Sequence, residues 1–217
     1  MTVGIGRCTV AALWICTAVA FHSPSARAAD WVVNGDFETG DFTGWSASGN
    51  NTVVLDAGDY EGHLGRPGPS DDSALWQDFF VPPGTPGVEI RFEYEFFGFD
   101  TSATWDDEFR ATFSYRTVSG WVDIVLLQEF SSSGTFNTVV DFADALALPA
   151  DLHTATPNAS LRFALTESLS PPGPVGTRVE LDDVSVSPVP EPGTLLLVGT
   201  GLLGLARWNR RRLRPGP

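Results

Sequence analysis

A chain of 217 residues is long enough for one or two domains, and this one carries a formal net charge of −14 without a single lysine. Between residues 29 and 188, six arginines are set against 26 aspartates and glutamates, which gives that segment a net charge of −20. A surface of this sign repels nucleic acid and anionic lipid and favours divalent cations, so nucleic-acid-binding functions are excluded.

The first 28 residues have the pattern of a signal peptide. Arg7 supplies positive charge, residues 8–21 form an apolar run, and an A-x-A cleavage pattern ends at Ala28, after which we expect the cut. The alternative is an uncleaved anchor helix, although the apolar run is short for one. Cleavage would remove both cysteines, Cys8 and Cys16, and would leave a mature protein without disulfides or thiol nucleophiles.

The segment from residue 31 to residue 188 has the pattern of an all-β domain. In RFEYEFFGF (91–99), Phe92, Tyr94 and Phe96 alternate with charged residues, which is typical of a half-buried strand. Residues 141–152 are the only helix-like stretch, and we expect at most one short helical turn there. Together with the Gly/Pro turns, the pattern predicts a single antiparallel β-sandwich or barrel. Further strands are predicted at 108–116, 121–127, 160–166 and 178–187.

The apolar face of the last predicted strand changes phase. Its apolar residues are odd-numbered up to Leu181 and even-numbered from Val184 onward. A slip of one residue turns every later side chain to the other face unless a β-bulge absorbs it. We therefore expect a local irregularity at the two carboxylates in between, Asp182 and Asp183.

Two motifs at the ends of this domain carry a resemblance. NGDFETGDFTGW (34–45) and LDDVSV (181–186) resemble the first and last strands of galactose-binding-like jelly rolls, which include many carbohydrate-binding modules. The resemblance implies a jelly-roll β-sandwich over residues 29–187 and a structural Ca²⁺ site. Its ligands would be the backbone carbonyl of Asp36 and the carboxylates of Glu38 and Asp182, and Ca²⁺ prefers such oxygens. The alternative is a plain bulge with solvated aspartates.

Sugar binding would require exposed aromatic faces beside polar groups. Five tryptophans lie between residues 29 and 188. Trp45 closes the first motif, and we expect it to pack in the core. Trp105 lies in a polar stretch and Trp121 follows a turn, so these two are the predicted sugar-stacking residues, with core packing as the alternative.

Catalytic signatures are scarce. His63 and His153 are the only histidines that follow the leader, no G-x-S-x-G elbow is present, and no His cluster indicates a zinc site. The acidic stretch WDDEF (105–109) lacks the spaced carboxylate pattern of jelly-roll glycosidases. We expect a protein that is not an enzyme; the alternative is a small hydrolase or lyase acting on polysaccharide.

The last 30 residues form a segment of their own. Pro190, Glu191 and Pro192 precede a short apolar helix predicted at 194–206 and a basic tail at 207–217. This three-part pattern over 188–217 resembles a PEP-CTERM sorting tag. The resemblance implies export in a Gram-negative bacterium, transient anchoring in the inner membrane, cleavage by an exosortase, and delivery to the cell surface or exopolysaccharide matrix. The basic tail agrees with a cytoplasmic end, and a permanent C-terminal anchor is the alternative.

Overall fold

The structure is a computed structural model that describes residues 30–65, 72–97, 106–132, 138–168 and 177–189. The predicted signal peptide, Trp105, the Pro190–Pro192 motif and the helix predicted at 194–206 lie outside these residues. Within the described part no helix is long and apolar enough to span a membrane. The strands there are β1 Ser46–Ser48, β2 Asn51–Asp56, β3 Asp59–Gly65, β4 Ser73–Phe79, β5 Gly87–Phe97, β6 Glu108–Thr117, β7 Gly120–Phe130, β8 Val140–Ala147, β9 Ala159–Thr166 and β10 Arg178–Pro188.

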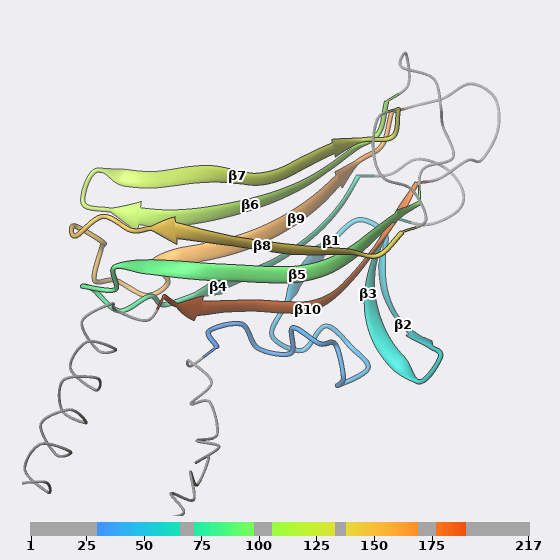
Figure 1. Ribbon diagram of the computed structural model, residues 1–217, viewed down its shortest axis with the longest axis horizontal. Coiled ribbons are helices and arrows are strands. Elements are labelled where there is room, and N and C mark those ends of the chain that lie inside the picture. The colour runs from blue at the N-terminus through green and yellow to red at the C-terminus, as the bar shows by residue number, and fades with distance from the viewer. Residues whose placement is uncertain (1–29, 66–71, 98–105, 133–137, 169–176, 190–217) are drawn as a thin grey trace, which may run out of the picture.

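The strands form two antiparallel sheets that pack face to face (Figure 1). Sheet A has the order β1-β4-β9-β6-β7, and sheet B has the order β2-β3-β10-β5-β8. Consecutive strands thus alternate between the sheets in places, as in a jelly roll. The all-β sandwich expected from the sequence is therefore confirmed.

The strict alternation of inward apolar and outward polar residues along the strands builds the core between the sheets. Phe92, Tyr94 and Phe96 of β5 are buried as expected, and Phe92 meets Phe163 of β9 edge-to-face at 5.0 Å between ring centroids. Trp45 is also buried, which confirms its predicted packing role. Because alternate residues of each strand enter the core, the intervening residues are presented on the outer faces.

The irregularity predicted in the last strand is present as a β-bulge. The register of β10 against β5 shifts between Asp182 and Ser185, and Asp183 has a positive φ of 48°. The bulge keeps both halves of the apolar pattern in the core, since Leu181 and Val184 are both buried.

Most of the helix-like stretch 141–152 is a strand in the structure. Residues 140–147 form β8, an edge strand that pairs with β5 through partners such as Phe142 and Phe92. The rings of these two residues stack at 4.5 Å between centroids. The alanine-rich stretch favours a helix locally, but cross-strand pairing and partial burial of Phe142 override that propensity.

Candidate functional site

The outer face of sheet B carries an acidic row that crosses four strands. Asp182 of β10 pairs with Glu93 of β5, and Glu93 pairs with Asp141 of β8. On the other side, Leu181 pairs with Gly62 of β3, so that Glu61 is the neighbour of Asp182. These four residues, Glu61, Asp182, Glu93 and Asp141, are named the acidic row below. They come together because each lies at an outward position of its strand.

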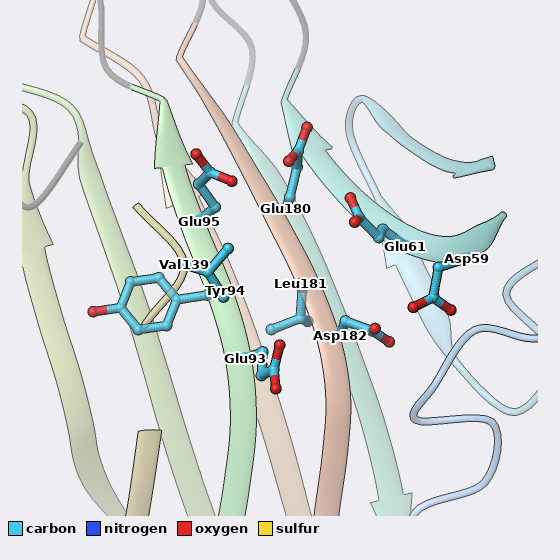
Figure 2. A pocket seen from close by; sticks show the side chains of 9 residues that line it. All are labelled: Asp59, Glu61, Glu93, Tyr94, Glu95, Val139, Glu180, Leu181 and Asp182. Atoms are coloured by element: carbon cyan, nitrogen blue, oxygen red, sulfur yellow. The ribbon is translucent and has the colours of Figure 1, made fainter. Parts of the chain in front are cut away.

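Two hollows lie along this face. One, of about 110 Å³, is lined by β3, β10 and β5 and is shown in Figure 2 with Glu61, Asp182 and Glu93 on its walls. The second, of about 440 Å³, continues over β5 and β8, and Glu93 lines both. Because they share Glu93, the two adjoining hollows are together called the groove below.

Two carboxyl groups of the groove, Asp182 and Glu93, have raised pKa values. Burial raises the pKa of Asp182 to about 7, and the neighbouring charges of Asp183, Asp59 and Glu61 act in the same direction. Burial also raises the pKa of Glu93, and a hydrogen bond with Asp141 adds to the shift. Loss of hydration and like-charge repulsion both disfavour the ionised form, so this face is a place where a bound cation would be favourable.

The predicted Ca²⁺ ligands lie close to one end of this groove. Val184 N–H donates to the carbonyl of Gly35 at 3.0 Å, which places the segment containing Asp36 and Glu38 beside the bulge. Glu38 Oε1 accepts the N–H of Tyr60 at 3.1 Å. Asp182 Oδ1 is buried and has no hydrogen-bond partner among the residues that the structure describes. Ca²⁺ binding by Asp36, Glu38 and Asp182 stays a prediction.

The outer face of sheet A has a different character. Trp121 of β7 is 49% exposed, and it pairs with Arg116 of β6 across the sheet. On the same face, the Arg162 guanidinium lies 5.2 Å from the ring of Trp76. The exposed indole of Trp121 offers a stacking surface to a ligand, and the arginines on this face offer hydrogen-bond donors. Among the predicted sugar-stacking residues, Trp121 is the one whose position is described.

The aspartates at positions 106 and 107 use their carboxylates to hold neighbouring strand ends together. Asp107 is buried, and it accepts hydrogen bonds from Ser168 N–H and from the Thr177 hydroxyl. Asp106 accepts the N–H and hydroxyl of Ser132, and these bonds lower its pKa. A general acid would require the opposite shift. These carboxylates fix the ends of β6, β7, β9 and β10 to one another.

Most residues of the groove were not predicted from the sequence as site residues. Glu61, Glu93 and Asp141 occupy outward positions of three strands, and no motif in the sequence marks them as a group. Alternation indicated that such residues face outward, but only strand pairing places them in one row.

The final strand leads directly into a known sorting signal. Strand β10 ends at Pro188, and residues 188–212 match the family model described as the PEP-CTERM protein-sorting motif. The chain carries a PEP-CTERM sorting motif. This motif marks an exported protein that is anchored in a membrane before sorting. No curated protein matches the chain in sequence.

Solved structures with the same fold include carbohydrate-binding modules. The CBM22-1-GH10 modules of Clostridium thermocellum xylanase 10B, in complex with xylohexaose, match with 13% identity, a TM-score of 0.50 and coverage of 75% of this chain and 29% of that chain. The tandem CBM22 domain of Paenibacillus barcinonensis Xyn10C matches with 11% identity, a TM-score of 0.51 and coverage of 78% and 52%.

A protein of another kind shares the same architecture. Tailspike protein 4 of bacteriophage CBA120 matches with 12% identity, a TM-score of 0.51 and coverage of 74% of this chain and 21% of that chain. This chain therefore spans about half or less of these three matched chains. At such identities the likeness shows the jelly-roll β-sandwich fold that the two end motifs predicted, and function has to be argued from sites.

Proposed function

We propose that this protein is a non-catalytic component of the cell surface or exopolysaccharide matrix of a Gram-negative bacterium. The observation that carries the proposal is the direct passage from β10 to the PEP-CTERM motif at Pro188. Val189 N–H still donates to the carbonyl of Gly87 at 3.0 Å, so the folded domain extends to the edge of the signal. An exosortase would cut near Pro190–Pro192 and release a folded domain.

Intact-mass measurement on protein from the native host tests the processing. We expect a mature chain that starts at Ala29 and lacks the segment after Pro192. Protein in the extracellular fraction that still carries Trp208 and the terminal arginines would contradict cleavage. A full-length tail found only in the membrane fraction would indicate the permanent anchor instead.

The role proposed for the sandwich is contact with polysaccharide through the outer face of sheet A. Trp121 supplies an exposed aromatic face, and Arg116 lies opposite it on β6. The hydroxyl of Ser114 donates to Asp123 at 2.7 Å beside them, so polar groups flank the indole. Trp105 stays a predicted second stacking residue. The fold likeness to carbohydrate-binding modules, one in complex with xylohexaose, supports this choice of ligand class.

A glycan array with the full-length protein and one variant pair tests this surface. Trp121→Ala should weaken binding by about 1–3 kcal/mol, on the scale of aromatic hot spots. Val125→Ala is the matched control, because Val125 is 51% exposed on the same face of β7 but carries no ring. Equal loss in both variants, or no glycan binding at all, would contradict the proposal. Release of new reducing ends from a bound polysaccharide would support the hydrolase or lyase alternative.

A further inference from the structure

A second group of ligand-type side chains on sheet B shares Glu61 with the acidic row. Glu61 and His63 both point outward from β3, and Glu180 points outward from β10 opposite His63. His63 Nε2 lies 3.4 Å from Glu61 Oε2 and 3.4 Å from Glu180 Oε1. The three ligand atoms all lie within 4.8 Å of one another. Figure 2 shows Glu61 and Glu180 projecting from neighbouring strands on the same side of the sheet.

These distances match the spacing of ligands around one small ion. Zn²⁺ binds imidazole nitrogen at about 2.0–2.1 Å and carboxylate oxygen at about 2.0–2.2 Å, so neighbouring ligands of a tetrahedral ion are roughly 3.4 Å apart. The nitrogen-to-oxygen separations already have this value. An ion could therefore enter with side-chain rotations alone.

The state of His63 also suits a metal ligand. The residue is 7% exposed, and burial together with the nearby Arg178 charge lowers its pKa to about 4. An uncharged imidazole offers a lone pair on Nε2 to a metal ion. An uncharged imidazole does not offset the negative charges of Glu61 and Glu180. Burial raises the pKa values of both carboxyl groups, so their ionised forms are disfavoured where no cation is bound.

Arg178 acts on this group from outside it. Its Nη2 lies 2.7 Å from Glu180 Oε1, and its guanidinium stacks 4.4 Å from the centre of the Phe97 ring. The ion pair holds the Glu180 carboxylate beside His63, and the Phe97 ring fixes the guanidinium in place. Carboxylates that bind metals are commonly oriented by such outer hydrogen bonds.

We propose that Glu61, His63 and Glu180 form a binding site for a first-row transition-metal ion such as Zn²⁺. An imidazole among the ligands favours Zn²⁺, Cu²⁺ or Ni²⁺ over Ca²⁺, which takes oxygen ligands. The site is distinct from the predicted Ca²⁺ site, which uses Asp36, Glu38 and Asp182. It also lies on the opposite sheet from Trp121, so it is independent of the proposed polysaccharide surface.

Calorimetric titration of the full-length protein in mild detergent with Zn²⁺, in the presence of millimolar Ca²⁺, tests this site. We expect one equivalent of Zn²⁺ to be lost, or bound at least tenfold more weakly, in Glu61→Gln and in His63→Gln. Co²⁺ in place of Zn²⁺ should give a visible absorption spectrum that both variants lose. Melting curves in EDTA would show that each variant is folded; if His63→Gln is not, Glu61→Gln carries the test.

Two matched controls make the result specific. His153→Gln removes the other histidine of the sandwich, whose Nδ1 accepts the N–H of Ala155 at 2.9 Å, and should leave Zn²⁺ binding unchanged. Asp182→Asn alters the predicted Ca²⁺ site and should also leave Zn²⁺ binding unchanged. Zn²⁺ binding that is absent from the wild-type protein, or equal in wild type and both site variants, would overturn the proposal.

Discussion

The N–H of Val184 donates a hydrogen bond to the carbonyl of Gly35, and this contact joins the bulge in β10 to the segment before β1. Gly35 has room for no side chain, because a Cβ at this position would lie 1.9 Å from the carbonyl oxygen of Val184. The NGDF motif and the DDV motif are therefore dependent on each other, although about 150 residues separate them.

Gly35→Ala should destabilise the protein strongly. The new methyl group meets backbone atoms of Val184, which cannot move aside without breaking the bulge, so we expect the free energy of unfolding to fall by about 3 kcal/mol. Gly84→Ala is the comparison, because Gly84 has a φ of +88° but nothing within 4 Å. Gly84→Ala should lower the free energy of unfolding only by the strain of that backbone conformation, about 1–2 kcal/mol. Urea denaturation measures both; equal losses would contradict the packing argument.

Calcium should stabilise the protein through Asp182. A ligand that binds only the folded state adds about 2.7 kcal/mol at a hundredfold excess over its Kd. We therefore expect Ca²⁺ to raise the melting temperature by several degrees and EDTA to reverse this. Mg²⁺ should do much less, since it demands a tight octahedral shell. Asp182→Ala should abolish the response, whereas Asp151→Ala, in an exposed turn, should keep it. Identical melting curves in EDTA and in millimolar Ca²⁺ would leave Asp182–Asp183 as a simple bulge.

Without metal ions the protein should be more stable at pH 5 than at pH 8. The pKa of Asp182 is raised to about 7, so the folded state holds a proton that the unfolded chain, with a pKa near 3.8, releases. The free energy of unfolding therefore falls as the pH rises from about 4 to about 7. The raised pKa values of Glu61, Glu93 and Glu180 act in the same direction.

Thermal denaturation in EDTA across this pH range checks the sign. Asp182→Asn should remove much of the dependence, because the amide carries no charge to bury at pH 8. A melting temperature that rises steadily from pH 5 to pH 8 would show that the acidic row is solvated well enough to ionise freely.

Asn158 should be one of the most sensitive polar positions. Its side chain is fully buried; Oδ1 accepts Val81 N–H at 2.7 Å, and Nδ2 donates to the carbonyls of Val81 and His153, both at 2.8 Å. Asn158→Ala leaves these backbone groups without partners, which should cost about 3 kcal/mol or more. Asn51→Ala, at a part-exposed position where Nδ2 donates to Ser48 at 2.7 Å, should cost about 1 kcal/mol. Chemical denaturation compares the two, and similar losses would contradict the role assigned to burial.

Local patterns in the sequence determined the class of fold, the bulge and the sorting signal. The alternation of Phe92, Tyr94 and Phe96 is a property of nine consecutive residues, and the phase change at Asp182 can be counted along one strand. The PEP-CTERM motif is likewise a short contiguous segment. Such features depend on periods of two residues or on neighbouring letters, so they can be recognised without knowing what packs against them.

Tertiary structure alone decided which strands are neighbours. The stretch that forms β8 is alanine-rich and helix-like by itself, and it becomes a strand because β5 offers it a partner and a place for Phe142. His63 and Glu180 are distant in the chain, and they meet because β3 and β10 pair in one register; a shift of one residue would turn either side chain into the core. Strand order and register arise from the packing of the whole domain, which is why the acidic row and the His63 cluster could be found only in the folded protein.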